Sequence, residues 1–344
     1  MKLYIVVPVV VLVIVGLMIA IGMRPVSSDK TPVRVVVMKG STARGVSRTL
    51  GGSGLIRSPF VFVLACRMSG ASATLKPGVY ELKRSMGVSE MIDRLVSGRT
   101  LENWVTMPEG FTARQMSDAL KDRQLISDDA FLRLVIEHGN EFSDYAFVYG
   151  NDLEGYLFPD TYLVAKGADS GVIVREMLDA FEKKVVDPNR GEIENVIRKR
   201  FGLGKESFAE GLYKLITVAS MIEREAKIPS DRPLVSAVFW NRLANGMRLE
   251  VCATVSYSPG VSADNKSKVY YTDLRKDSPY NTYMRAGLPA GPICNPGLES
   301  IKAAMRPASV DYLFYVARRD GGHKFSRTFK EHVAAKNAIR NGRM

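Results

Sequence analysis

An apolar segment near the N-terminus constrains the fold of this chain more than any other feature. Leu3–Met23 is a run of 21 residues without a charged side chain, flanked on both sides by basic residues. At about 1.5 Å per residue, a helix of this length crosses the hydrocarbon core of a bilayer. A cleaved signal peptide usually has a shorter apolar region followed by small residues, a pattern that Ala20-Ile21-Gly22 matches poorly. We therefore expect residues 1–24 to form a transmembrane anchor.

The composition is that of a basic, folded protein. Hydrophobic residues make up 46% of the chain, which is enough for packed cores and excludes a wholly disordered chain. The formal net charge of +12 suits contact with an anionic surface, such as phospholipid, nucleic acid or acidic cell-wall polymer. The Lys and Arg residues are spread along the sequence, and no zinc finger or other nucleic-acid motif accompanies them. We therefore expect no nucleic-acid partner.

Residues 32–150, which follow a polar linker over residues 25–31, contain an internal repeat. Setting Gly40 on Gly110 aligns further identical pairs. These pairs are Val35/Val105, Thr42/Thr112, Ala43/Ala113, Arg44/Arg114, Ser47/Ser117, Leu50/Leu120, Leu55/Leu125 and Ile56/Ile126. Each copy is predicted to contain a strand, a turn at glycine, a helix capped near Ser41 or Thr112, and a second helix that starts near Ser58 or Ser127. The region carries no cluster of titratable side chains, so we expect it to bind or to space rather than to catalyse.

From residue 151 the sequence predicts a second, larger unit that extends to residue 344. Helical patterns cover residues 170–185, 208–227 and 231–244. The helix over residues 208–227 places its apolar side chains on one stripe, the expected core face, formed by Leu212, Leu215, Ala219, Ile222 and Ala226. Glycine and proline interrupt the last hundred or so residues, for which we expect mostly short strands and loops. The chain as a whole is predicted to be an α+β protein.

Several kinds of chemistry lack their motifs. The sequence has no G-x-S-x-G, no P-loop and no H-E-x-x-H, which excludes most hydrolase and nucleotide-binding classes. It has three histidines and three cysteines but no C-x-x-C pair, so we expect no metal site. Outside the cytoplasm, Cys252 and Cys294 could form a disulfide that closes a loop of about 42 residues. Three independent thiols are the alternative.

Two carboxylates near the end of the helix over residues 208–227 are candidates for acid–base chemistry. Glycan cleavage needs a carboxylic acid that protonates a leaving oxygen, and an apolar setting raises its pKa for that task. Glu223 and Glu225 both flank the apolar stripe, but they lie about 200° apart on a helical wheel and cannot share one site. The wheel places Glu223 nearer the centre of the stripe. An ordinary surface helix end, with Glu223 reaching Lys227, is the alternative.

Two later segments have the composition of a carbohydrate cleft. Residues 281–297 combine amide, hydroxyl and aromatic side chains with turns that expose the backbone, and residues 321–326 form a second polar turn. Sugar rings favour flat apolar faces with hydrogen-bonding rims, which such loops supply. A loop-rich scaffold without a ligand would have the same composition.

Motifs along the chain resemble those of one family. The segments that carry the resemblance are Glu154-Gly-Tyr-Leu-Phe-Pro-Asp-Thr-Tyr, Val218-Ala-Ser-Met-Ile-Glu-Arg-Glu, Val238-Phe-Trp-Asn-Arg-Leu, Gly246-Met-Arg-Leu, Tyr280-Asn-Thr-Tyr, Gly287-Leu-Pro-Ala-Gly-Pro-Ile, Asn295-Pro-Gly and Gly322-His-Lys-Phe. In this order they resemble the MltG (YceG-like) endolytic murein transglycosylases, and the resemblance covers nearly the whole chain. It implies an N-terminal transmembrane helix, a small LysM-like α/β module within residues 32–150 and a mixed helical and loop/strand catalytic domain over residues 151–344.

The resemblance also implies an activity and a location. The family consists of peptidoglycan lytic transglycosylases, which are lyases. They cleave the MurNAc-β-1,4-GlcNAc bond with formation of 1,6-anhydro-MurNAc and thereby terminate the elongation of nascent glycan strands. The expected location is the bacterial inner membrane, with a single pass, a cytoplasmic tip and the bulk of the chain in the periplasm. Peptidoglycan is then the substrate, cell-wall synthesis enzymes are candidate partners, and no cofactor is required.

Site residues follow from the same resemblance. The second glutamate of the family's Glu-x-Glu pair is catalytic, which selects Glu225. The candidate substrate-binding residues are Glu154, Tyr156, Glu223, Asn241, Arg248, Asn281, Tyr283 and His323. In one place this chain departs from the family, because it has Cys252-Ala253 where the family usually has aspartate and proline. A bond from Cys252 to Cys294 would replace a polar contact there by a covalent one.

Two other functions stay open at this point. A hydrolytic muramidase would use the same acid, but it needs a second carboxylate at the scissile bond, for which the sequence offers no convincing candidate. A non-catalytic cell-wall binding or divisome scaffold protein would use the LysM-like module alone. Glu225 would then be dispensable.

Overall fold

The chain divides into two compact units. The computed structural model describes residues 13, 15–38, 40–98, 102–165, 167–204, 207–258 and 269–342. Unit 1 consists of residues 1–104 with 163–166, and unit 2 of residues 105–162 with 167–344. The chain passes from unit 1 to unit 2 in strand β3 (Glu102–Thr106) and returns briefly in β4 (Thr161–Ala165), and these two strands pair. The boundary expected at residue 150 falls inside unit 2, because residues 105–162 pack with the residues that follow.

The predicted anchor lies partly outside the described residues, which exclude residues 1–12 and 14. Residues 15–23 are helical. Within the part of the chain that the structure describes, no helix is both long enough and apolar enough to cross a membrane.

Unit 1 is a small α/β module. Strands β1 (Pro32–Val37) and β2 (Gly78–Lys83) pair in antiparallel register, and helices α2 (Ala43–Gly52) and α3 (Pro59–Met68) connect them. Helix α4 (Val88–Ser97) follows β2. Both strands and all three helices contribute buried side chains to one core.

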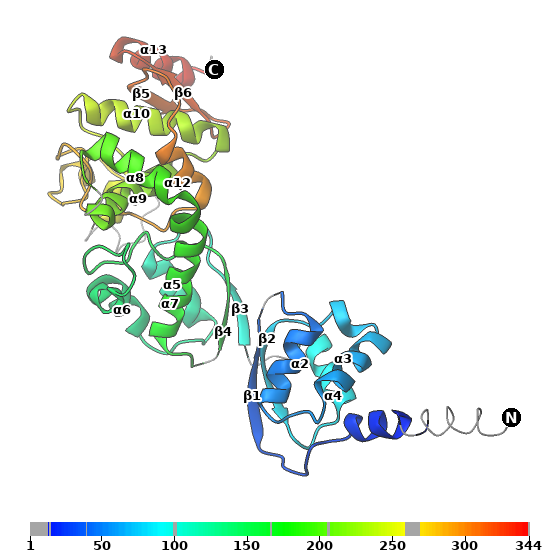
Figure 1. The fold of residues 1–344 in the computed structure, drawn as a ribbon. Coiled ribbons are helices and arrows are strands. Elements are labelled where there is room, and N and C mark those ends of the chain that lie inside the picture. The colour runs from blue at the N-terminus through cyan, green and yellow to red at the C-terminus, as the bar shows by residue number, and fades with distance from the viewer. Residues whose placement is uncertain are drawn as a thin grey trace. The chain divides into compact units, whose positions relative to one another are not determined.

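The two segments that the offset of 70 aligns have the same order of elements. Strand β3, helices α5 (Ala113–Asp122) and α6 (Ala130–Glu137), strand β4 and helix α7 (Ser170–Phe181) repeat the order of β1, α2, α3, β2 and α4 (Figure 1). The caps also match, because Thr42 Oγ1 accepts from Gly45 N and Thr112 Oγ1 accepts from Gln115 N, each at 3.2 Å. The first cap is thus Thr42, next to the expected Ser41. Ser58 caps α3 as expected, whereas α6 begins after Asp129 and not near Ser127.

Unit 2 is built around one buried helix, α9 (Phe208–Glu225). Helix α7 continues through a π-helical turn (Glu182–Val186) into α8 (Asp187–Phe201), and a 3-10 turn (Pro229–Asp231) leads from α9 into α10 (Arg232–Ala244). Helices α8, α10, α11 (Cys252–Tyr257) and α12 (Leu298–Met305) all contact α9 (Figure 1). The predicted core stripe of α9 is confirmed, because all five of its residues are buried.

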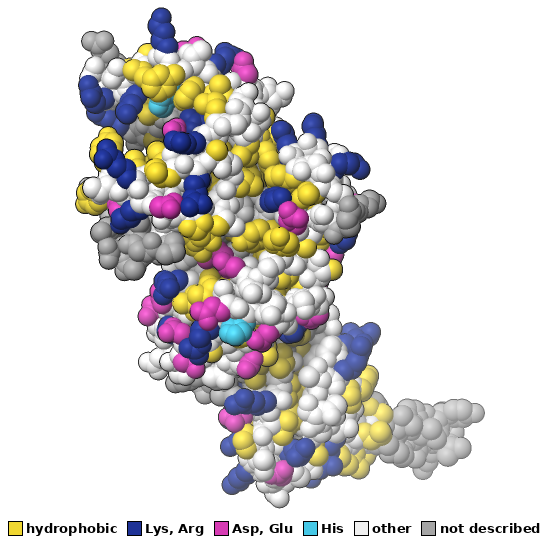
Figure 2. All heavy atoms as spheres, turned by 90° about the vertical axis from the view of Figure 1, so that its left-hand side faces the viewer, with side chains coloured by type: hydrophobic (Ala, Val, Ile, Leu, Met, Phe, Trp, Pro, Cys, Tyr) yellow, Lys and Arg dark blue, Asp and Glu magenta, His cyan; other side chains and the backbone are white. Residues whose placement is uncertain are grey.

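The C-terminal region contains more helix than the sequence analysis predicted. The hairpin of β5 (Phe314–Ala317) and β6 (His323–Ser326) agrees with the expected short strands, but α8, α12 and α13 (Phe329–Arg340) were not predicted. Helix α13 had a recognisable signal, because Thr328 and Glu331 form a capping box at its start. The exposed face in Figure 2 carries Lys and Arg side chains in scattered positions with Asp and Glu among them.

The matched caps predict a matched loss of stability. Because each threonine satisfies a backbone N–H that otherwise lacks a partner, Thr42→Ala and Thr112→Ala should each lower the free energy of unfolding by about 1 kcal/mol. Urea denaturation followed by circular dichroism measures the loss. Thr→Ser at either position keeps the hydroxyl and should keep most of the stability. A loss as large in the serine variants would contradict the role of the hydroxyl.

Candidate active site

Glu225 is the last residue of α9, and its side chain lies partly buried beside the β5–β6 hairpin. Glu225 Oε2 accepts a hydrogen bond from the Tyr315 hydroxyl at 3.1 Å, and the backbone N–H of Ala253 also donates to this carboxylate. Burial raises the pKa of Glu225 above its ordinary value, and the bond from Tyr315 and the charge of His323 offset part of that effect. The carboxyl group therefore favours the protonated form more than an exposed glutamate does. The Tyr315 hydroxyl can stabilise its ionised form by a hydrogen bond.

Tyr315 is held in place from its far side by a histidine–aspartate pair. The Tyr315 and His323 rings meet edge to face, with centroids 5.1 Å apart. Asp231 Oδ2 accepts from the His323 backbone N–H at 2.8 Å and lies 3.0 Å from the ring nitrogen Nδ1. Asp231 lies in the turn between α9 and α10. Its contacts with His323 therefore connect the start of β6 to that turn. His323, a predicted site residue, therefore lies in the surroundings of Glu225.

Arg242 fixes the hairpin to α10 and to the loop before α11. This buried side chain donates from Nε to Leu313 O at 2.7 Å and from Nη1 to the carbonyl oxygens of Arg248 and Leu249, each at 3.0 Å. Its guanidinium lies 5.1 Å from the centre of the Phe314 ring. Leu313 and Phe314 directly precede Tyr315. Arg242 therefore sets where the Tyr315 hydroxyl stands.

The predicted sugar-binding loop contributes Tyr283 to the site. The Tyr283 hydroxyl lies 3.0 Å from Cys252 Sγ, and the charge of Glu225 helps to raise the pKa of Tyr283. Arg248 Nη1 donates to Tyr283 O at 3.2 Å, so this predicted site residue is beside the same loop. Asn281 is buried instead: its amide donates to Leu274 O and Lys276 O and accepts from Tyr283 N. Direct sugar contact by Asn281 is thus wrong, because the amide is consumed in shaping the loop.

The two cysteines of the predicted disulfide are free. Cys252 is exposed at the start of α11, whereas Cys294 is buried and its thiol donates to Ser220 O at 3.4 Å. The disulfide prediction is wrong, because the two thiols face different surroundings. The departure at position 253 has a consequence of its own: Ala253 has a backbone N–H for Glu225, and a proline there would have none.

Glu223 faces away from this site and holds a neighbouring loop. Its Oε2 accepts from Gly297 N at 3.0 Å, and its Oε1 lies 3.5 Å from Arg232 Nη2. Arg224 donates to Gly110 O at 3.2 Å. The Glu223 carboxylate, which the helical wheel had placed nearer the centre of the apolar stripe, is thus occupied by the backbone N–H of Gly297. This contact agrees with the family resemblance, which selects Glu225.

Glu154 and Tyr156 are buried, so the prediction that they contact substrate is wrong. Tyr156 packs among aromatic rings with no exposed atom to offer. Glu154 is the centre of a buried network: its carboxylate accepts from the first N–H of α5 (Ala113), from the Tyr257 hydroxyl at 3.1 Å and from Asn295 Nδ2 at 2.7 Å. The network joins α5, α11 and the loop before α12. It therefore helps to hold α11, the helix that carries Ala253.

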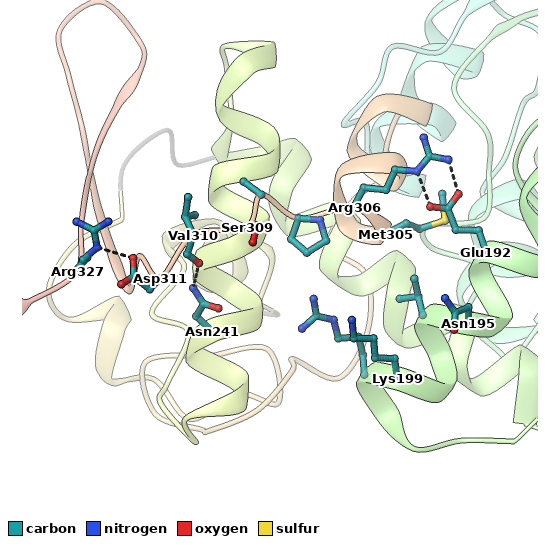
Figure 3. A pocket seen from close by; sticks show the side chains of 14 residues that line it. Glu192, Asn195, Lys199, Asn241, Met305, Arg306, Ser309, Val310, Asp311 and Arg327 are labelled. Atoms are coloured by element: carbon teal, nitrogen blue, oxygen red, sulfur yellow. Dashed lines mark hydrogen bonds and ion pairs between the residues drawn. The ribbon is translucent and has the colours of Figure 1, made fainter.

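Asn241 lines a different pocket. This pocket has a volume of about 760 Å³ and lies between α8, α10 and the segment that follows α12 (Figure 3). The Asn241 amide donates to Val310 O and Tyr312 O at 2.9 and 3.0 Å. Neither Glu225 nor Tyr315 lines the pocket. Asn241 therefore ties α10 to the segment leading into β5, and its predicted contact with substrate stays a prediction.

The structure thus brings together Glu225, Tyr283, Arg248 and His323, and it adds three residues that sequence reasoning missed. No sequence motif pointed to a role for Tyr315, Asp231 or Arg242. Arg242 does lie within one of the segments that carry the family resemblance, Val238–Leu243. Among the residues described, no group of His, Cys, Asp and Glu side chains is arranged to hold a metal ion. The arrangement can protonate one leaving oxygen and take the proton back.

The fold and the site define an α+β protein with a partly desolvated carboxylate at the end of its central helix. The chain belongs to the YceG-like family, whose model matches residues 35–338.

Relatives with known names support this membership. An endolytic murein transglycosylase of Bacillus subtilis is 33% identical over 328 residues, covering 91% of this chain and 87% of that protein. One from Streptococcus pneumoniae (strain D39) is 27% identical, covering 90% of this chain but 60% of that longer protein. The crystal structure of a YceG-like protein from Listeria monocytogenes covers 89% of this chain, with a TM-score of 0.59 and 30% identity.

The Tyr315 hydrogen bond predicts a direction for the titration of Glu225. Tyr315→Phe removes a donor to the carboxylate, so it should raise the pKa of Glu225 further above its ordinary value. Carbon-13 NMR titration of labelled glutamate side chains measures it. Tyr312→Phe, in the segment that leads into β5 and without a bond to Glu225, should leave that pKa unchanged. An equal pKa in the parent and in Tyr315→Phe would contradict the assigned contact.

The buried network predicts how stability depends on pH. Burial raises the pKa of Glu154 from 4.5 to about 8, so the folded state binds its proton more tightly than the unfolded chain does. The resulting stabilisation is complete below about pH 4.5 and is lost as the pH rises through about 8. Glu154→Gln cannot ionise, so urea denaturation at several pH values should show a flatter dependence of unfolding free energy. The same slope in both proteins would contradict this.

Proposed function

We propose that this protein is an endolytic murein transglycosylase with Glu225 as its acid and base. The observation that carries the proposal is the single desolvated carboxylate that faces the Tyr315 hydroxyl at the end of α9. The name shared by relatives that align with most of this chain supports murein as the substrate. The bond cleaved is then MurNAc-β-1,4-GlcNAc, within the strand and not only at its end.

In the first step Glu225 acts as a general acid. A carboxyl group with a raised pKa retains its proton closer to neutral pH and can pass it to the glycosidic oxygen as the bond to the sugar breaks. As the proton leaves, the carboxylate gains charge, and the Tyr315 hydroxyl and the Ala253 N–H are already oriented toward it. The two donors need no rearrangement at that moment, which is how preorganised groups lower a barrier.

In the second step the carboxylate acts as a base. The C6 hydroxyl of the same muramic acid ring attacks the anomeric carbon, and Glu225 takes the hydroxyl proton as the 1,6-anhydro ring closes. Because the nucleophile is tethered to the reacting ring, its effective concentration is high and no second carboxylate has to activate water. One residue therefore suffices, and no cofactor enters the reaction.

Glu250, a second carboxylate near this loop, is paired with an arginine. Glu250 and Glu225 both act electrostatically on Tyr283, so Glu250 is close to the same loop. Its Oε2 lies 3.1 Å from Arg242 Nη1. A muramidase would need a carboxylate free to activate water. The pairing therefore favours the transglycosylase over the hydrolase.

The location and partners belong to the same proposal. The uncharged run of residues 3–23 supports a single-pass anchor in the bacterial inner membrane, with the catalytic unit in the periplasm. The β1–α2–α3–β2 arrangement in unit 1 suits a LysM-like module that holds glycan. Cell-wall synthesis enzymes are the partners we propose, because cleavage within a nascent strand ends its elongation.

Replacing the acid tests the function. The full chain, solubilised in detergent, should release internal fragments that end in 1,6-anhydro-MurNAc from purified peptidoglycan, detected by mass spectrometry. Glu225→Gln should lower the rate by about 100-fold or more, because the amide cannot donate a proton. Glu137→Gln, an exposed carboxylate at the end of α6, is the matched control and should retain full activity.

Three outcomes would contradict the proposal. Fragments with reducing ends would make the protein a muramidase. Equal activity of the parent and Glu225→Gln would show that this carboxylate is not the acid. Absence of cleavage by either protein would favour a binding-only scaffold.

A further inference from the structure

The part of unit 1 that follows the apolar segment has an unusual charge. Residues 30–80 contain eight Lys or Arg residues and no Asp or Glu. Three of these cations lie on α2 and α3, namely Arg44, Arg48 and Arg67, and none of the three forms an ion pair with another residue that the structure describes. A basic surface without internal neutralisation suits an anionic partner.

Helix α3 leaves apolar side chains in solvent beside these cations. The Phe60 side chain is 73% exposed and Met68 is 80% exposed, although both belong to a helix of ten mostly apolar residues. With the half-buried Val63 they follow the spacing of one helix face. Large exposed hydrophobic side chains on one helix face usually mark a contact surface.

The cations and the apolar side chains meet in one hollow. The space between α2 and α3 has a volume of about 360 Å³. Its lining residues are Arg44, Ser47, Arg48, Pro59, Phe60, Val63 and Arg67. A ligand that fits has a negative group for the guanidinium groups and an apolar part for Phe60 and Val63. Phospholipid head groups with their acyl chains have both.

The end of the apolar segment packs against the same helix. A Cβ atom added to Gly22 would lie 2.7 Å from Val61 Cγ2, so the backbone at Gly22 directly contacts α3. Arg57 then holds the following chain, since it donates to Pro25 O at 3.0 Å and to Val26 O at 2.8 Å. The point where the apolar segment ends is therefore fixed next to the start of α3.

We propose that the α2–α3 face of unit 1 lies on the surface of an anionic phospholipid bilayer, with Arg44, Arg48 and Arg67 on the phosphates and Phe60 and Met68 in the interface. The proposal rests on the membrane anchoring put forward above. If residues 3–23 span the bilayer, Gly22 and the helix packed on it lie at the boundary of the hydrocarbon. Basic side chains at that level each favour an anionic leaflet, and apolar side chains on the same helix insert among the head groups.

Such docking would give unit 1 a second attachment to the membrane. The docked face would add a contact with lipid beyond the apolar segment itself. A module held at the membrane surface meets glycan strands close to where they emerge.

Quenching by brominated lipids tests the docking. The full chain with Phe60→Trp is reconstituted into vesicles with brominated acyl chains, either containing phosphatidylglycerol or made of phosphatidylcholine alone. The parent chain supplies the background from the native tryptophans. We expect quenching of the added tryptophan in the phosphatidylglycerol vesicles and much less in phosphatidylcholine.

Adding Arg44→Gln and Arg48→Gln should lower the docked-to-free ratio by about 30-fold. Lys330→Gln with Lys336→Gln, exposed positions on α13, removes the same charge elsewhere and should change nothing.

Each other outcome contradicts a separate part of the proposal. Equal quenching in both lipids, or none in either, would overturn the docking surface even if the chain resists alkaline extraction. Release of the chain at alkaline pH would overturn the anchoring and the docking with it. A third outcome is that the arginine variant binds purified murein less well while quenching is the same in both lipids. The face would then bind glycan and not phospholipid. Cleavage of soluble glycan strands in detergent should be equal in the parent and in the arginine variant, so this test does not depend on Glu225.

Discussion

The site depends on the way in which α9 emerges from the core. Residues 215–222 of this helix are all buried, because other helices of unit 2 cover it on several sides. The helix ends at Glu225, and Pro229 prevents it from continuing. A carboxylate one turn beyond a fully buried segment is desolvated on its core side and open on the other. Burial of α9 therefore fixes both the position and the raised pKa of Glu225.

The remaining contacts bring donors to that carboxylate from segments far apart in the sequence. Tyr315 comes from the β5–β6 hairpin, which Arg242 ties to α10 and which Asp231 ties to the turn after α9. Ala253 belongs to α11. Glu154 connects this helix to α5, because its carboxylate accepts hydrogen bonds from the Tyr257 hydroxyl on α11 and from the first backbone N–H of α5. Buried polar groups of this kind are costly unless they are all satisfied, so the network rigidifies the unit that carries Glu225. The proposed chemistry needs one residue, and the placement of that residue needs several others.

The sequence predicted those features that depend on local patterns. The apolar stripe of α9 and the Thr112 cap both follow from residues within a few turns of each other. Features that depend on distant contacts were missed. Nothing near Tyr315 in the sequence indicates Glu225, and nothing near Glu154 indicates that an α5 backbone N–H consumes its carboxylate. Asn281 and Asn241 are polar residues within motifs, yet both are used to fix loops, because a motif does not distinguish a residue that touches a ligand from one that shapes the site.

Cleavage of glycan at Glu225 can be tested by a crystal structure of the Glu225→Gln variant with a bound peptidoglycan fragment. We expect the glycosidic oxygen to lie about 3 Å from the side-chain amide at position 225, with the Tyr315 hydroxyl beside it and Tyr283 along the sugar. A fragment bound instead in the pocket between α8 and α10, with position 225 out of reach of any glycosidic oxygen, would contradict it.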